Sequence, residues 1–221
     1  MDDRKTEAFL MPKHPKRALT EAELQRMREA CGASKRDLAL FEFLRSTGCR
    51  AHEMLFTRIE DVDIENKRVF LRKTKAKIEW AFKDGKRTYK GSKVVPRTSF
   101  FDDIAAKAVA EYIDERRAEG AGDEDQIFTI DQNAECDGWM TRHIVKGLAK
   151  AAKIPDWKHI SPHYLRHSRA TLLNASGYPT NLIKETMGWS QKSLTFETVY
   201  THPDVDMMQR LHKKMVEHKG E

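Results

Sequence analysis

The segment from Ser161 to Tyr200 constrains the fold and chemistry of this chain more than any other. Serine commonly caps a helix and proline fits the first helical position, so Ser161-Pro162 predicts that a helix begins here. His163 and Arg166, three residues apart, then lie on one face of its opening turns. The start of a helix also offers unpaired N–H groups and a partial positive charge. This local pattern therefore predicts a site for an oxyanion or a phosphate.

A second cluster lies upstream, in FEFLRSTGCRAHEML, where Arg50 and Glu53 are again three residues apart. Gly48 separates two apolar helical stretches, so we predict that it ends one helix and aims Arg50 inward from the turn. Taken alone, an arginine and a glutamate at this spacing are usually a surface ion pair. A functional pair becomes the better interpretation only in combination with the downstream cluster.

In order, the chain carries TGCRAHE, a basic hairpin with KTKAK, then HYLRH, MGW and ETVYTH. This order resembles the tyrosine recombinases, also called the phage-integrase family, from about residue 18 onward. The resemblance implies an α+β, mainly α-helical catalytic domain with a small antiparallel β-sheet or hairpin on one side. It also implies a site-specific DNA recombinase or integrase that cleaves and rejoins strands through a 3′-phosphotyrosyl intermediate, with no metal, ATP or other cofactor. The family's active-site positions correspond to Arg50, His163, Arg166, Trp189 and Tyr200.

The chemistry explains why these residue types are needed. A phosphodiester is anionic and repels a nucleophile, so Arg50 and Arg166 are expected to grip its non-bridging oxygens and neutralise the phosphorane. Tyr200 is the expected nucleophile. A phenol has a pKa of about 10, so it needs a base or a positive field, and His163 can accept its proton or return one in the reverse step. The alternative for Tyr200 is an aromatic side chain packed on an amphipathic helix.

Two further residues are assigned supporting roles. Many family members have histidine where this chain has Trp189. An indole can donate one hydrogen bond to a phosphate and can pack against the tyrosine helix, but it cannot transfer protons. We therefore expect Trp189 to position the site, with simple core packing as the alternative, and we expect Glu53 to support Arg50.

A β-hairpin is predicted between the two clusters. Val69–Leu71 has the pattern of a strand, Lys93–Pro96 that of its partner, and Asp84-Gly85 that of the turn between them. The connection is long compared with the family pattern.

By resemblance, a lysine on this hairpin is the general acid for the 5′-oxygen leaving group. Lys75 is the first choice, with Lys73 and Lys77 as alternatives, because strand alternation places all three on the same face. The run from Lys67 to Arg97 is strongly basic, which is typical of a solvated face and also suits DNA. Lys73, Lys77 and Arg97 are accordingly candidate DNA contacts.

The C-terminal part departs from the family pattern in one respect. The interval from Trp189 to Tyr200 is about two residues longer than the resemblance to compact bacterial members implies. The tyrosine segment is therefore expected either to sit loosely in its own site or to reach the site of a neighbouring protomer. Residues 204–218 have helical apolar spacing, and this helix is expected to fold on its own core or to dock on a neighbour.

The 221 residues, 39% of them hydrophobic, favour one domain over residues 18–221 preceded by a charged tail or linker over residues 1–17. No N-terminal core-binding domain is expected, which corresponds to either a truncated piece or a naturally minimal enzyme. A catalytic domain without that second domain makes fewer phosphate contacts, so weak, salt-sensitive DNA binding is predicted. Helices are predicted over residues 20–30, 34–46, 50–56, 102–119, 141–152, 163–175 and 181–187 and from about residue 194.

The formal charge of +6 and a pI of about 9.1 suit double-stranded DNA as the partner. Cys31, Cys49 and Cys136 lack the spacing of a zinc site or a disulfide framework, so reduced thiols are expected. No apolar segment is long enough for a membrane span. We therefore expect a cytoplasmic, nucleoid-associated protein without membrane or metal, forming a homo-oligomer (a tetramer) on DNA, with a monomer in solution as the free form.

Three other functions are alternatives to this one. A catalytically inert DNA-binding regulator on the same fold predicts loss of the tyrosine or an arginine, yet those positions are filled. A type IB topoisomerase-like enzyme shares the chemistry and stays open as an alternative. A metal-dependent nuclease is disfavoured because no paired carboxylates cluster near the arginines in the sequence.

Overall fold

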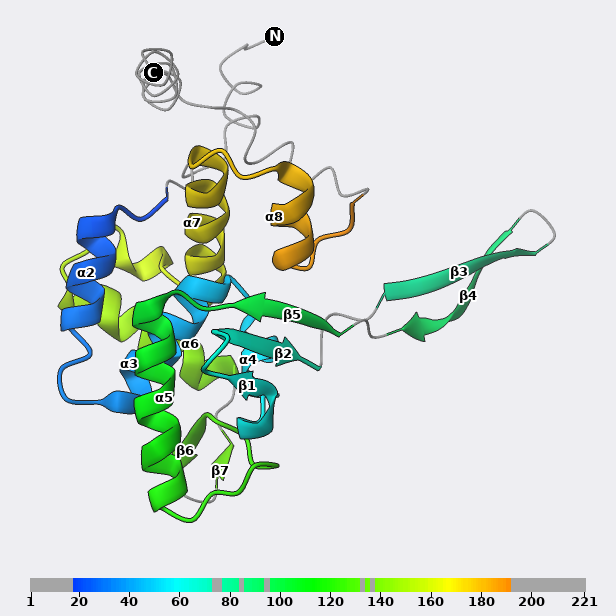
Figure 1. The fold of residues 1–221 in the computed structure, drawn as a ribbon. Helices are drawn as coiled ribbons and strands as arrows, with labels where there is room; N and C mark the ends of the chain where they lie inside the picture. Colours follow the sequence, from blue (N-terminus) through cyan, green and yellow to red (C-terminus); the bar gives the residue numbers. More distant parts are fainter. Residues whose placement is uncertain are drawn as a thin grey trace, which may run out of the picture.

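The computed structural model describes residues 18–72, 77–83, 86–93, 96–131, 134–135 and 138–191 (Figure 1), and for residues 77–93 and 130–135 it describes the backbone alone. The helices of this part are α2 (Glu21–Glu29), α3 (Lys35–Thr47), α4 (Ala51–Leu55), α5 (Asp103–Ala118), α6 (Gly138–Ala151), α7 (Pro162–Ala175) and α8 (Thr180–Thr186), with 3-10 turns η1 (Ile59–Asp61) and η2 (Trp157–His159). The strands are β1 (Val62–Asp63), β2 (Arg68–Leu71), β3 (Lys77–Lys83), β4 (Lys86–Lys93), β5 (Arg97–Phe100), β6 (Thr129–Asp131) and β7 (Ala134–Glu135). A mainly helical α+β fold with a small antiparallel sheet is thereby confirmed.

The starts of α2 and α7 follow from their sequences. Thr20 Oγ1 accepts the Glu23 N–H at 3.3 Å, and the Glu23 carboxylate accepts the Thr20 N–H at 2.9 Å, so a capping box opens α2. Pro162 occupies the first turn of α7 and Ser161 its N-cap position, but the serine side chain makes no capping hydrogen bond. The helix start was predicted correctly, whereas the serine contributes by its position alone.

Helix α3 forms the centre of the core. Leu40, Phe43 and Leu44 are fully buried, and α3 packs against both α5 and α7. The ring of Phe43 meets Phe101 and Phe128 edge to face, with centroids 5.2 and 5.6 Å away. A helix that is apolar on most sides must lie inside the fold. Its C-terminal end therefore provides a fixed origin for the segment that follows.

The three-stranded sheet corrects one prediction. β2 pairs antiparallel with β1 and with β5, and Val69 lies opposite Ser99. The partner of Val69–Leu71 is thus Arg97–Phe100, not Lys93–Pro96. The prediction treated the basic segment as the connection between two paired strands. Within that segment β3 and β4 pair with each other instead, with Lys83 opposite Lys86. The true partner of β2 lies beyond that hairpin.

The β3–β4 hairpin extends away from the helices and the three-stranded sheet (Figure 1). Lys77 is the first residue of β3, and its side chain is not described. Lys73 and Lys75 lie outside the described residues, as do the predicted turn at residues 84–85, the predicted tail or linker at residues 1–17 and the two predicted C-terminal helices. The predictions that concern these segments stay predictions.

Two cysteines of the described part are buried and free. Burial raises the pKa of Cys31 and of Cys49 to about 12, so both thiols stay protonated at neutral pH. Cys136 lies outside the described residues. In the ranges that the structure describes, no helix combines the length and apolar character that crossing a membrane requires.

Candidate active site

The site begins at the turn after α3. Gly48 ends this helix with a left-handed φ of +59°, and a Cβ atom there would lie 2.5 Å from Cε of Met187. A side chain at this position would be strained by the left-handed backbone, and the end of the Met187 side chain would have to move. The chain then becomes extended at Arg50, the N-cap residue of α4. This turn presents the arginine to the interior, as predicted.

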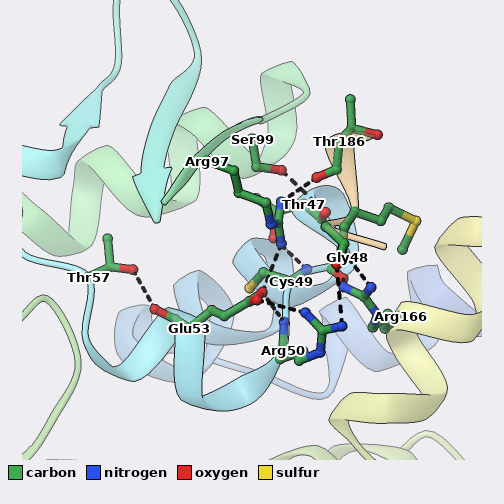
Figure 2. Close-up of polar contacts among 12 residues, drawn as sticks. Thr47, Gly48, Cys49, Arg50, Glu53, Thr57, Arg97, Ser99, Arg166 and Thr186 are labelled. Atoms are coloured by element: carbon green, nitrogen blue, oxygen red, sulfur yellow. Dashed lines mark hydrogen bonds and ion pairs between the residues drawn. The ribbon is translucent and has the colours of Figure 1, made fainter. Parts of the chain in front are cut away.

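Glu53 holds Arg50 in place. One carboxylate oxygen accepts the backbone N–H of Arg50 at 2.8 Å, and the other accepts Nη1 of its guanidinium at 2.8 Å (Figure 2). The Glu53 side chain is fully buried, which contradicts the alternative of a surface ion pair. Two bonds to one carboxylate fix both the backbone and the side chain of Arg50.

A third bond to this carboxylate comes from β5. Nη2 of Arg97 donates to Glu53 at 2.8 Å, and Nη1 of Arg97 donates to the carbonyl of Thr186 at the end of α8 (Figure 2). Burial alone would raise the pKa of Glu53, but Arg97, followed by the backbone N–H and guanidinium of Arg50, outweighs it and holds the pKa below its ordinary value. Glu53 is therefore ionised at neutral pH. The predicted DNA contact by Arg97 stays a prediction, since the contacts described for it are internal.

Arg166 comes from the second turn of α7 and is 2% exposed. Its Nη1 donates to the carbonyl of Gly48 at 2.7 Å and its Nη2 to that of Met187 at 2.5 Å. Burial, and next repulsion from Arg50, lowers the pKa of Arg166 to about 9. The arginine is thus held by carbonyl groups and forms no ion pair with a carboxylate among the described residues, which favours binding of an anion beside it.

Trp189 lies against Arg166, as a positioning role requires. The guanidinium carbon of Arg166 is 4.3 Å from the centroid of the indole ring, a cation–π contact. The backbone N–H of Trp189 donates to the carbonyl of Lys184 at 2.7 Å, which fixes the backbone just after α8. Trp189 also packs against the small apolar cluster that includes Ile183 and Met187. The positioning and packing interpretations therefore coexist.

A pocket of about 220 Å³ joins these elements. Arg50, His163 and Arg166 line it together, although they come from α4 and α7, far apart in the sequence. No acidic side chain is among the described residues that line this pocket. Cationic walls without a carboxylate provide the environment that a phosphodiester needs. The predicted oxyanion site is thus supported by its geometry.

Arg142 of α6 also lines the pocket, although it was not among the residues predicted for the site. Its side chain is exposed, and none of the hydrogen bonds or ion pairs found in the described part of the chain involves it. No motif marks an isolated cation on an amphipathic helix, so only the packing of α6 beside α7 could reveal it.

The structure therefore brings together Arg50, Glu53, His163, Arg166 and Trp189. Of these, Arg50, His163 and Arg166 line the pocket. The predicted nucleophile, Tyr200, lies outside the described residues, so its approach to the pocket is not described. Among described residues, no group of three His, Cys, Asp or Glu side chains has the arrangement of a metal site.

Comparison with known proteins agrees with this geometry. Residues 17–207 match the model of the phage integrase family. The chain is 31% identical to the tyrosine recombinase XerC of Treponema denticola over 190 residues, covering 80% of this chain and 55% of the relative. The chain belongs to the phage integrase family. It spans about half the length of that relative.

Two solved structures share the fold. The crystal structure of XerA recombinase aligns with a TM-score of 0.73 at 24% identity, covering 93% of this chain and 65% of that chain. XerH, a site-specific recombinase bound to its palindromic difH substrate in a post-cleavage complex, aligns with a TM-score of 0.64 at 23% identity, covering 91% and 53%. At these identities the likeness establishes the fold alone.

Proposed function

We propose that this chain carries the catalytic site of a site-specific DNA recombinase that cleaves and rejoins strands through a 3′-phosphotyrosyl intermediate at Tyr200. The observation that carries the proposal is the single pocket lined by Arg50, His163 and Arg166. Membership of the phage integrase family and the 31% identity to a tyrosine recombinase support the same reaction. The DNA-bound state of XerH supports double-stranded DNA as the substrate.

In the proposed reaction, Arg50 and Arg166 hold the non-bridging oxygens of the scissile phosphate. Arg50 donates N–H groups to Glu53, and Arg166 donates them to backbone carbonyls. These bonds fix the plane of each guanidinium and leave further N–H groups for a ligand. Because these donors are already oriented, they stabilise charge that grows on the phosphorane without reorganising. Loss of one such donor costs about 3–4 kcal/mol of barrier.

Tyr200 Oη attacks phosphorus and forms the 3′-phosphotyrosyl bond as the bond to the 5′-oxygen breaks. His163 accepts the phenolic proton, and Lys75 protonates the departing 5′-oxygen. Trp189 holds Arg166 and the segment that leads to the tyrosine. In the rejoining step a 5′-hydroxyl attacks the phosphotyrosine, the same proton transfers run backward and Tyr200 is released. Atoms and charge balance without a cofactor.

A trapping experiment tests this proposal. A library of duplexes with a nick beside a randomised central stretch is incubated with the full chain; after cleavage the short fragment diffuses away, which prevents rejoining. We expect a protein–DNA adduct that survives denaturation, and sequencing of the trapped strands identifies the preferred site. Tyr200→Phe is expected to form none. An equal adduct with Tyr200→Phe, or none with the wild type, would contradict the proposal.

The same experiment separates the alternatives. A catalytically inert DNA-binding regulator retains DNA in a native gel but gives no adduct under denaturing conditions. A type IB topoisomerase-like enzyme gives the adduct and relaxes supercoiled plasmid without exchanging strands between two sites. We expect both the adduct and, on two copies of the recovered site, exchanged products.

We further propose that the protein acts as a homo-oligomer, a tetramer on DNA, and as a monomer when free. A palindromic substrate such as that of XerH presents two equivalent half-sites, which suits two copies of one chain, and exchange joins two such sites. Since cellular DNA is the proposed substrate, we place the protein in the cytoplasm with the nucleoid. Mass measurement with and without the recovered site tests the stoichiometry.

A further inference from the structure

The end of α8 receives three arginines on three consecutive carbonyl groups. Arg97 donates to the carbonyl of Thr186, Arg166 to that of Met187 at 2.5 Å, and Arg50 to that of Gly188 at 3.4 Å. These arginines come from β5, α7 and the start of α4, three elements distant in the sequence. Figure 2 shows Arg50, Arg97 and Arg166 converging on this region from different sides.

The hydrogen-bond partners of the carbonyls at the end of α8 explain this arrangement. The last carbonyls of a helix lack intrahelical partners and carry a partial negative charge. Here the carbonyls of residues 183, 184 and 185 accept the N–H groups of Met187, Trp189 and Gly188. The carbonyls of residues 186, 187 and 188 come next, and these are the three that accept the arginines. The end of α8 is therefore a backbone template that holds three guanidinium groups.

Arg97 differs from the other two because it does not line the pocket, although it joins this template to the carboxylate of Glu53 as Arg50 also does. Its side chain is 11% exposed, against 25% for Arg50, and its two terminal nitrogens bind Glu53 and Thr186. Both acceptors also belong to the surroundings of the active-site arginines: Glu53 fixes Arg50, and the residue after Thr186 accepts a bond from Arg166. Arg97 thus touches the supports of both.

We propose that Arg97 is a positioning residue: by bridging Glu53 to the end of α8 it sets the relative placement of Arg50 and Arg166 for strand cleavage. The catalytic part of this inference rests on the proposed function. Arg97 does not line the pocket, so its effect passes through Glu53 and through the carbonyls after α8. The same bridge fixes the origin of the segment that leads to Tyr200.

Removal of Arg97 has two expected consequences. Glu53, fully buried, loses the cation that contributes most to keeping it ionised, while Arg50, Arg166 and Cys49 still face it. The pKa of Glu53 therefore rises, and the acid limb of the pH–rate profile for cleavage moves to higher pH. The end of α8 also loses its tie to β5. Displacement of catalytic groups by about 1 Å can slow a reaction about a hundredfold.

The test compares Arg97→Ala with Arg45→Ala. Arg45 is a matched control: its side chain is 12% exposed, it pairs with Glu42 and Asp102, and it lies outside the pocket. Both variants lose a largely buried, ion-paired arginine, so both are expected to melt at a lower temperature. Only Arg97→Ala is expected to slow single-turnover cleavage, by about tenfold to a hundredfold when the DNA site identified by trapping is saturating. Only this variant is also expected to shift the acid limb of the pH–rate profile.

Chemical rescue sharpens the comparison. Guanidinium chloride, well below denaturing concentration and matched with sodium chloride, can fill the space left in Arg97→Ala and is expected to restore most of the rate. Cleavage by Arg97→Ala at the wild-type rate, or a slowing equal to that of Arg45→Ala without rescue, would overturn the inference. If Arg97→Ala does not fold, Arg97→Lys replaces it, since one ammonium cannot bridge both acceptors. Slowed cleavage by Arg97→Lys supports the inference, and a wild-type rate contradicts it.

A second measurement separates this inference from the proposed function. In ¹⁵N-labelled protein without DNA, the Arg50 Nε–H and Trp189 indole signals are expected to shift in Arg97→Ala, to return with guanidinium and to stay in place in Arg45→Ala. Unchanged signals would contradict the bridge whatever the enzyme does. A wild type that forms no adduct while these signals shift would instead contradict the proposed reaction and leave the bridge standing.

Discussion

Gly188 lies so close to Arg97 that a Cβ atom on the glycine would come 2.5 Å from Nε of the arginine. Gly188 also has a left-handed φ of +68°. We therefore expect Gly188→Ala to lower the free energy of unfolding by about 1–3 kcal/mol through backbone strain and to displace Arg97 as well. Thermal unfolding and the rate of adduct formation measure the two effects.

Gly177→Ala is the matched control for this variant. Gly177 follows α7 with a φ of +79°, but nothing lies within 4 Å of its would-be Cβ atom. It therefore reports strain without a collision. We expect both variants to lose stability and only Gly188→Ala to lose cleavage. Equal cleavage by the two glycine variants would show that the contact with Arg97 does not matter.

Binding of an anion in the pocket should stabilise the protein. The pKa of Arg166 lies at about 9, below its ordinary value, so the folded state disfavours the charged guanidinium, and a bound anion reverses that preference. We expect sulfate and orthovanadate to raise the melting temperature above that in chloride of equal ionic strength. Ligand at about a hundred times its Kd adds about 2.7 kcal/mol.

Variants assign this stabilisation to the pocket. Arg50→Met removes one cation from the wall and is expected to abolish the difference between sulfate and chloride. Arg117→Ala, which removes an exposed cation of α5 paired with Asp123, is expected to retain it. Loss of the effect in both variants would point to a general effect of salt.

Much of this site could be predicted because local patterns place its parts. Gly48 was expected to end a helix and aim Arg50 inward, and His163 and Arg166 to share one end of a helix; the structure confirms both placements. Helix breaks and residue spacing are encoded over a few positions. The surface-pair alternative for Arg50 and Glu53 was wrong, because burial depends on how α4 packs.

Other features depend on contacts that leave no local pattern. In β5 only Ser99 is buried, so Arg97–Phe100 lacks the apolar alternation that marks a strand, and its pairing with β2 was missed. The arginines are held by backbone carbonyls, and because every residue has one, the sequence does not mark these acceptors. Arg142 is an isolated cation until α6 packs beside α7. Long-range packing, not local propensity, completes the site.

Arg142 is predicted to bind a DNA phosphate close to the scissile one. It lines the same pocket as Arg50 and His163, and its side chain is exposed. We expect Arg142→Ala to weaken DNA binding and to reduce the slope of log K against log salt by about 0.9, because one phosphate contact is lost. Binding titrations at several salt concentrations measure this slope. Arg117→Ala removes the same charge elsewhere, and an equal change in both variants would refute a specific contact.

The stability contributed by Glu53 should depend on pH. Arg97, Arg50 and Arg166 face its carboxylate, as does Cys49, and the net effect on its pKa is a lowering. A lowered carboxyl pKa adds stability above the unfolded-state value of about 4.3, and this stability is lost as pH falls through the folded-state pKa. We expect Glu53→Gln to cost about 3 kcal/mol at pH 7 and less in acid.

The control for this prediction is Glu60→Gln. Glu60 makes exposed pairs with Arg58 and Arg72, which contribute about 0–1 kcal/mol. Denaturant unfolding at pH 7 and near pH 4 measures both variants. A Glu53→Gln loss as small as that of Glu60→Gln, or one that grows in acid, would contradict the assigned sign.

The general acid can be tested with DNA in which sulfur replaces the bridging 5′-oxygen at the recovered site. A thiolate leaves without a proton, so this substrate removes the need for an acid but keeps the need for charge stabilisation at the non-bridging oxygens. We expect Lys75→Ala to cleave the normal site slowly and the sulfur-containing site at nearly the wild-type rate. Arg50→Ala, which breaks the clamp held by Glu53, should stay slow on both. If the sulfur substrate instead rescues Lys73→Ala or Lys77→Ala and not Lys75→Ala, the proton comes from that lysine.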